Sequence, residues 1–188
     1  SATRTVPVYA TVTDAQGRLV PDLEQKDFEV FDDGKKVELS LFENVVQPIT
    51  VVVMLDTSGS MTMNLELLKQ AATQFVIRLL PEDRARVGSF SDKIRVSPPD
   101  FTGDRDELMR ILRDDIQYGN PTALWDATEA SMEALRDMQG RRVVLVFTDG
   151  ADTYSRRSQG DILNRARADE FMIYAIGLRS QMRGQGVT

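Results

Sequence analysis

The stretch ITVVVMLDTSGSMTMN, residues 49–64, decides the fold because it joins an uninterrupted apolar run to a polar loop. Residues 49–55 are apolar or β-branched without alternation, which is typical of a parallel strand buried on both faces of a sheet. After the loop, apolar residues at helical spacing over 68–79 predict a helix, which Pro81 ends. The stretch therefore predicts a strand, a loop and a helix in succession.

The same alternation continues toward the C-terminus. The further predicted elements are two strands within 84–97, helices over 104–113 and 122–138, a strand over 142–147, a helix beginning at Ser158 and a strand over 171–177. Strands that alternate with helices are typical of βαβ crossovers. We therefore predict an α/β fold with a doubly wound, mostly parallel sheet and helices on both of its faces.

Residues 1–47 have a different pattern and predict a small N-terminal β segment before the α/β domain at 48–188. Alternating residues over 6–12, a short apolar run over 28–31 and a second alternation over 37–41 predict three short strands. Three strands of this size bury too little surface to be stable alone, so we expect the segment to pack on something else.

The composition excludes several classes of function. The 188 residues include no histidine and no cysteine, which rules out Ser-His-Asp and thiol catalysis, disulfides and zinc sites made of imidazole or thiolate. The formal net charge of −6 lacks the electrostatic footprint of a nucleic-acid binder. No apolar run is long enough to span a membrane. Any metal site must use oxygen ligands, which favours Mg²⁺, Mn²⁺ or Ca²⁺.

Polar side chains follow the predicted strands at the sheet edge where ligands bind in open α/β folds. Asp56, Ser58 and Ser60 come directly after the first apolar strand, Thr122 precedes a helix, and Asp149 follows the strand over 142–147. Two carboxylates and three hydroxyls would leave a divalent cation electron-poor, so that an incoming carboxylate becomes a favourable further ligand. We also expect two helix N-termini, near Asn64 and Thr122, to add partial positive charge there.

DTSGS at 56–60, together with Thr122 and Asp149, resembles the metal-ion-dependent adhesion site (MIDAS) of von Willebrand factor type A (VWA) domains. The resemblance covers residues 48–178 and implies a Rossmann-like sheet. It also implies a site in which Asp56, Ser58, Ser60, Thr122 and Asp149 hold Mg²⁺, with Mn²⁺ or Ca²⁺ as alternatives. The implied partner is a protein or peptide that offers an Asp or Glu carboxylate.

The segment at 8–36, VYATVTDAQGRLVPDLEQKDFEVFDDGKK, is similar to the one that precedes this domain in bacterial VWFA-related proteins. That similarity implies an extracellular, periplasmic or cell-envelope location. Since the sequence ends soon after the strand over 171–177, the domain is expected to lack its last helix and strand.

Three functions are compatible with these residues. The first is a non-enzymatic adhesion module without catalytic or organic-cofactor residues, which we predict. The second is a Mg²⁺-dependent phosphohydrolase with Asp56 as nucleophile, but the loop DTSGSMTMN has no lysine to bind a phosphate. The third is an intracellular assembly scaffold in which the metal only stabilises loops. Turnover of a phosphate ester and partner binding with chelator would separate the three.

Several neighbours of the predicted site have two interpretations. Thr122 is a metal ligand, a helix N-cap, or both. Met61 and Met63 form either an apolar rim beside the ion or packing at the helix entry. Trp125 is interpreted as helix packing, with a place on the binding face as the alternative. Asp152 is interpreted as a solvated loop residue, with water binding beside the ion as the alternative.

The charged residues outside the site have simpler interpretations. Asp104, Asp106 and Glu107 are predicted to stabilise a helix N-terminus. The pair Arg141-Arg142 precedes a strand at the end opposite the predicted metal and is interpreted as a solvated edge.

Overall fold

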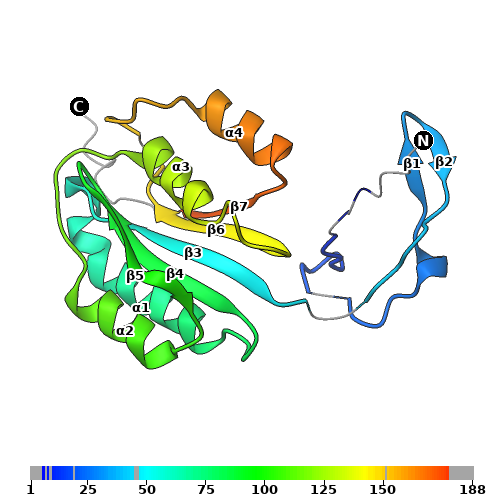
Figure 1. Cartoon of the computed structure of the whole chain (residues 1–188), viewed down its shortest axis with the longest axis horizontal. Helices are drawn as coiled ribbons and strands as arrows, with labels where there is room; N and C mark the ends of the chain where they lie inside the picture. The colour runs from blue at the N-terminus through cyan, green and yellow to red at the C-terminus, as the bar shows by residue number, and fades with distance from the viewer. Residues whose placement is uncertain are drawn as a thin grey trace, which may run out of the picture. The chain divides into compact units, whose positions relative to one another are not determined.

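The chain divides into two compact units, Ser1–Val46 and Gln47–Thr188 (Figure 1). The structure, a computed structural model, describes residues 6, 8, 10–18, 20–44, 47–150 and 152–177. No helix within these ranges is long and apolar enough to cross a membrane. Residues 178–188, on which the expectation of a missing last helix and strand falls, lie outside them.

The first unit contains one antiparallel hairpin, formed by β1 (Val30–Asp32) and β2 (Lys35–Val37). Asp33 and Gly34 connect the strands with φ angles of 44° and 76°, the two positive values that a type I′ turn requires. A single 3-10 turn, η1 (Gln25–Asp27), precedes the hairpin. None of the described residues in this unit is buried, so it has no core of its own.

Two of the three N-terminal strand predictions are wrong for the residues that can be described. Of the strand predicted over 6–12, the described residues form none, while Pro7 and Tyr9 lie outside the description. The alternation over 37–41 continues only as far as the end of β2 at Val37. Alternation stabilises a strand only where a neighbouring strand and a covered face are available.

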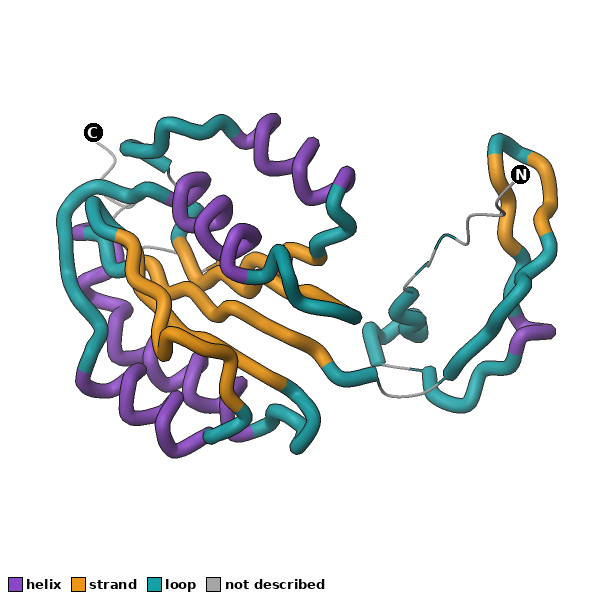
Figure 2. Tube along the Cα trace, in the orientation of Figure 1, coloured by secondary structure: helices purple, strands orange, loops and turns teal. Residues whose placement is uncertain are grey.

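The second unit is a five-stranded sheet in the order β5-β4-β3-β6-β7, with helices on both faces (Figure 2). Its strands are β3 (Ile49–Asp56), β4 (Arg84–Phe90), β5 (Ile94–Thr102), β6 (Arg141–Thr148) and β7 (Met172–Gly177). Its helices are the 3-10 helix η2 (Gly59–Asn64) and α1 (Leu65–Ile77), α2 (Arg105–Asp114), α3 (Leu124–Ala134) and α4 (Gln159–Ala168). All pairings are parallel except that of β4 with β5, which confirms the predicted fold class.

The central strand β3 is covered on both faces, as its unbroken apolar sequence predicts. Val51 and Val53 pack into the core that α1 and α2 cover, whereas Val52 and Met54 pack into the core beneath α3 and α4. All four side chains are fully buried. Because the chain passes from β3 to β4 on one side and reaches β6 on the other, the carboxyl end of β3 is the point where the strand order reverses, which is where ligands bind in open α/β sheets.

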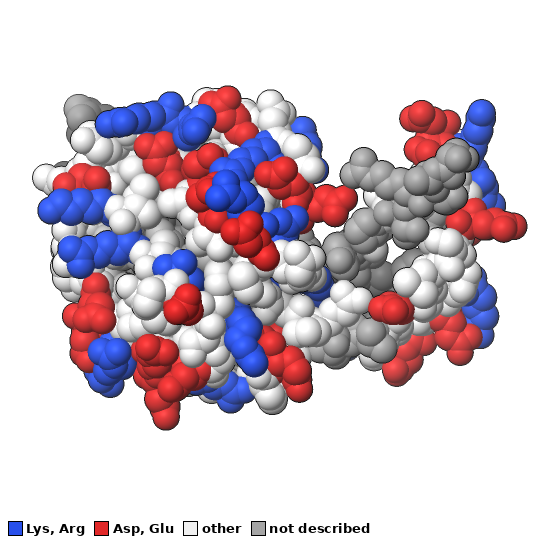
Figure 3. Space-filling model, in the orientation of Figure 1, with Lys and Arg blue, Asp and Glu red and all other residues white. Residues whose placement is uncertain are grey.

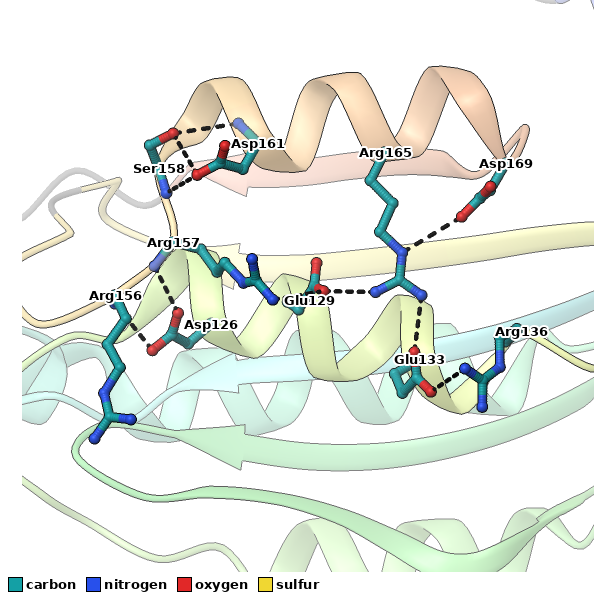
Figure 4. Close-up of polar contacts among 10 residues, drawn as sticks. All are labelled: Asp126, Glu129, Glu133, Arg136, Arg156, Arg157, Ser158, Asp161, Arg165 and Asp169. Atoms are coloured by element: carbon teal, nitrogen blue, oxygen red, sulfur yellow. Dashed lines mark hydrogen bonds and ion pairs between the residues drawn. The ribbon is translucent and has the colours of Figure 1, made fainter.

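Helices α3 and α4 are joined by ion pairs on the outside of the unit. The guanidinium of Arg165 in α4 lies 2.6 Å from Glu129 and 2.8 Å from Glu133, both in α3 (Figure 4). The Glu133 carboxylate raises the pKa of Arg165 further above its ordinary value. Acidic and basic side chains alternate over the visible face of this unit, so the negative net charge is not gathered into one patch there (Figure 3).

Two features lie at the borders of the sheet, and the first corrects a sequence interpretation. Arg142 is half-buried rather than solvated, because its guanidinium lies 4.3 Å from the ring centroid of Phe171 and donates to backbone carbonyls. The edge strand β5 includes Pro98 and Pro99, which have no N–H to offer to a further strand.

Asp104 caps α2 as predicted, and its side chain accepts from the backbone N–H groups of Asp106 and Glu107 in the first turn of the helix.

Candidate functional site

Asp56, the last residue of β3, is fully buried at the carboxyl edge of the sheet. Its Oδ1 accepts from the backbone N of Ser58 at 3.0 Å, and its Oδ2 accepts from Thr148 Oγ1 at 2.7 Å. Thr148 ends β6 and directly precedes Asp149. The carboxylate of Asp56 is therefore held between its own loop and the end of the neighbouring strand.

Burial raises the pKa of Asp56 above its ordinary value, and the negative charge of Asp149 raises it further. The hydrogen bonds from Ser58 and Thr148 act in the opposite direction but do not outweigh the burial. A cation next to this carboxylate would favour its charged form and relieve the cost of burying it.

The loop after β3 brings two hydroxyls together. Ser58 is buried, and its Oγ lies 3.1 Å from the Oγ of Ser60. Gly59 separates them and donates its N–H to the carbonyl of Asn120 at 3.2 Å. A Cβ on Gly59 would lie 2.7 Å from Asn120 Oδ1, so a larger residue at this position would require the Asn120 side chain to move.

Thr122 is buried two residues after Asn120 and is bound to the loop that follows β6. Its backbone N donates to Thr153 Oγ1 at 3.0 Å, and its carbonyl accepts from the backbone N of Thr153 at 2.9 Å and of Tyr154 at 3.0 Å. The half-buried Asp149 lies in the same loop as Thr153. Hydrogen bonds therefore link the three loops that carry the five predicted ligands.

The residues present suit a hard divalent cation. Every donor is an oxygen, and the 3.1 Å between the Ser58 and Ser60 hydroxyls is close to the roughly 3 Å between adjacent ligands of an octahedral Mg²⁺ with bonds of about 2.1 Å. No group of three or more Asp or Glu side chains among the described residues could hold a metal ion. A cation at this edge would thus depend on hydroxyls beside two carboxylates, and the five ligands remain a prediction.

Asp152 is not the solvated loop residue that the sequence suggested. Its Oδ1 accepts from the backbone N of Leu124 at 2.8 Å and of Trp125 at 3.4 Å, so it caps α3 from a distant loop. The N-cap position of α3 is Ala123, which corrects the interpretation of Thr122 as a helix cap. No local sequence signal identifies such a cap, because 28 residues separate Asp152 from Leu124.

The structure corrects one further expectation and decides between the two interpretations of Met61. The positive end of α3 is bound to the carboxylate of Asp152, so its N–H groups are not available to an anion at the site. Met61 is fully buried in the core beneath α1 and does not form a rim, whereas Met63 is 85% exposed. Trp125 is half-buried and packs against the core on the α3 and α4 side, as interpreted.

Solved structures with a similar fold include two bacterial proteins. One is an aerotolerance-related membrane protein from Bacteroides fragilis, which is 18% identical with a TM-score of 0.59 over 74% of this chain and 75% of that one. The other is the vWF domain of the type V pili tip protein Mfa5 from Porphyromonas gingivalis, 20% identical with a TM-score of 0.53. That match covers 62% of this chain and 44% of the Mfa5 chain. No curated protein sequence matches this chain.

The sequence family agrees with the fold. The family model of the von Willebrand factor type A domain matches residues 50–187, which includes all of the five-stranded sheet except Ile49 and all five predicted ligands. The family predicted from DTSGS at 56–60 is thereby confirmed, and the chain belongs to the von Willebrand factor type A domain family.

Proposed function

We propose that the α/β unit is a non-enzymatic protein-binding module that captures a carboxylate of its partner at a divalent-cation site. Domains of this family are typically interaction or adhesion modules. The observation that carries the proposal is the fully buried Asp56 carboxylate beside the paired hydroxyls of Ser58 and Ser60. Such an acidic group, withdrawn from water and surrounded by oxygen donors, is suited to a cation.

Each proposed ligand has a role in this site. Asp56 and Asp149 would supply the negative charge, and the neutral hydroxyls of Ser58, Ser60 and Thr122 would complete the ligand set. The cation is Mg²⁺, with Mn²⁺ or Ca²⁺ as alternatives, and when bound it supplies a coordination position for one carboxylate oxygen of the partner. Ser60 is exposed, whereas Ser58 and Thr122 are buried, so a partner would approach the site from the side of Ser60.

The proposed partner is a protein or peptide with an accessible Asp or Glu, and the proposed location is the cell envelope or the exterior. The structural neighbours support the location, because one is a membrane protein and the other is a pilus tip protein.

The proposal can be tested with Mn²⁺ as the probe. We expect Mn²⁺ to bind with an enhancement of water-proton relaxation, and a short peptide with a central Asp to reduce that enhancement by displacing water. The same peptide with Asn in place of Asp should have no effect, since an amide oxygen is a weaker ligand for a hard cation. The variants Asp56→Ala, Ser58→Ala and Thr122→Ala should weaken Mn²⁺ binding while remaining folded by circular dichroism.

A matched control is Asp137→Ala, which removes a carboxylate whose side chain is 93% exposed, just beyond α3. It should bind Mn²⁺ as the unmodified chain does. Mn²⁺ binding that survives Asp56→Ala would contradict the proposed site. Mn²⁺ binding without any response to the Asp peptide would favour the scaffold, and Mg²⁺-dependent turnover of p-nitrophenyl phosphate would favour the phosphohydrolase.

A further inference from the structure

The first turn of α3 is bound by a loop that lies far away in the sequence. The first N–H groups of a helix have no partner within the helix. In α3 the N–H groups of Leu124 and Trp125 are accepted by Asp152 Oδ1, and that of Asp126 is accepted by Ser155 Oγ at 3.0 Å. Ser155 Oγ in turn donates to Asp152 Oδ1 at 2.6 Å.

The contact is reciprocal, because α3 also binds the backbone of that loop. The two carboxylate oxygens of Asp126 accept from the backbone N of Arg156 and of Arg157, each at 3.0 Å (Figure 4). In an ordinary capping box the cap residue and the acidic residue three positions later exchange such bonds within one segment. Here the two halves come from different segments, and we name Asp126, Asp152 and Ser155 the split capping box.

An ordinary capping box a few residues further on provides the comparison. Ser158 Oγ accepts from the backbone N of Asp161 at 3.2 Å, and the Asp161 carboxylate accepts from Ser158 N at 3.0 Å (Figure 4). This box stabilises only the start of α4. The split capping box differs because it joins two loops.

Those two loops carry two of the proposed ligands. Thr122 lies two residues before Leu124, whose backbone N donates to Asp152 of the split capping box. Asp149 lies three residues before Asp152. Two hydrogen bonds between Thr122 and Thr153 lie next to the box: Thr122 N donates to Thr153 Oγ1, and Thr153 N donates to the Thr122 carbonyl. These hydrogen bonds thus tie the segment of Thr122 to the loop that carries Asp149.

We propose that the split capping box positions Thr122 relative to Asp149 and thereby sets the cation affinity of the site. Asp152 and Asp126 act as positioning residues: their carboxylates are already bound to backbone N–H groups. The cation-affinity part of this inference rests on the proposed function, whereas the joining of the two loops does not.

The test measures Mn²⁺ affinity in the whole chain by titration. We expect Asp152→Ala to lower the affinity about tenfold or more, the size seen when residues that orient metal ligands are removed. Asp152→Asn keeps an acceptor oxygen and is as good a cap as Asp, so it should restore most of the affinity. Asp126→Ala removes the reciprocal half without touching the cap, and it should also weaken binding.

Ser158→Ala is the matched control, because it removes a helix cap from the same stretch of chain without touching Thr122. It should lower the melting temperature and leave the Mn²⁺ affinity unchanged. If Asp152→Ala and Asp126→Ala also lower only the melting temperature, the split capping box is merely a helix cap and the inference is wrong.

Hydrogen exchange separates a failure of this inference from a failure of the proposed function. In Asp152→Ala the amides of 122–126 and of 153–157 should exchange faster together, while in Ser158→Ala only those at the start of α4 should. The faster exchange in Asp152→Ala is expected even if the unmodified chain binds no Mn²⁺. A lack of Mn²⁺ binding by the unmodified chain would overturn the proposed function but not the joining of the two loops. Unchanged exchange in both loops of Asp152→Ala would overturn the inference itself.

Discussion

Gly88 lies in β4 at a point where the backbone of β5 leaves no room for a side chain. A Cβ at this position would overlap the carbonyl oxygen of Arg95 and lie 2.9 Å from Met54 Sδ. We expect Gly88→Ala to lower the free energy of unfolding by about 2 kcal/mol or more, because the backbone of β5 would have to move. Urea denaturation, followed by circular dichroism, measures the effect.

Gly160 provides the opposite case for the same substitution. It lies exposed in the first turn of α4, where the nearest atom to an added Cβ is Ser158 Oγ at 3.7 Å. Gly160→Ala should therefore raise the free energy of unfolding by roughly 0.5 kcal/mol, because alanine has less conformational freedom to lose in the unfolded chain. Equal effects at the two glycines would show that the close approach at Gly88 is not restrictive.

Among the elements, α1 has two adjacent leucines with opposite surroundings. Leu68 is fully buried against the sheet, whereas Leu67 is 53% exposed. We expect Leu68→Ala to cost about 2–5 kcal/mol of unfolding free energy through lost burial and the cavity left behind. Leu67→Ala should change it by no more than about 0.5 kcal/mol. Urea denaturation of the two variants compares one chemical change in two environments, and similar losses would contradict the packing of α1.

The elements of the α/β unit could be predicted from local patterns, because the spacing of apolar residues along the sequence shows which side of each strand or helix is buried. The run at 49–55 matches β3 to within one residue, and Ser158 with Asp161 correctly predicts the start of α4. The start of α3 was predicted two residues early, because its cap comes from Asp152 in another loop. The spacing of apolar residues carries no information about a hydrogen bond between two segments that are far apart in the sequence.

In the candidate site, too, the local sequence identifies a loop but does not show which distant segments that loop contacts. DTSGS at 56–60 identifies the loop after β3, and the structure links that loop to those of Thr122 and Asp149. The sequence leaves two interpretations of Met61 open, an apolar rim or packing at the helix entry, and the structure shows that its side chain turns into the core. The reason is that η2 winds the loop tightly before α1 begins, which places one side of it against the sheet.

At the scale of the whole molecule, the two units should differ in their ability to fold alone. The described part of residues 1–46 contains no buried side chain, and Phe31 is 58% exposed in its only hairpin. Ordering a residue costs about 1–2 kcal/mol of backbone entropy, which this unit does not offset by burial. A fragment of residues 1–46 should therefore show no cooperative thermal transition by circular dichroism. A sigmoidal melt of the fragment would refute this expectation.

The stability of the whole chain should depend on the proposed cation. A ligand that binds only the folded state stabilises it by about 2.7 kcal/mol at a hundredfold excess over its dissociation constant. We expect Mg²⁺ to raise the melting temperature, EDTA to reverse the rise, and Asp56→Ala to abolish it. A shift that persists in Asp56→Ala would place the bound ion elsewhere on the chain.

The prolines of β5 bear on how this protein behaves at high concentration. An edge strand with free N–H groups is a template on which strands of other copies can add and grow into fibres. Pro98 and Pro99 interrupt that template on one side of the sheet, and β7 is the opposite edge among the strands that the structure describes. If two copies paired edge to edge through β7, both outer edges of the combined sheet would be β5 strands. Aggregation through sheet edges should thus end at pairs instead of propagating into filaments.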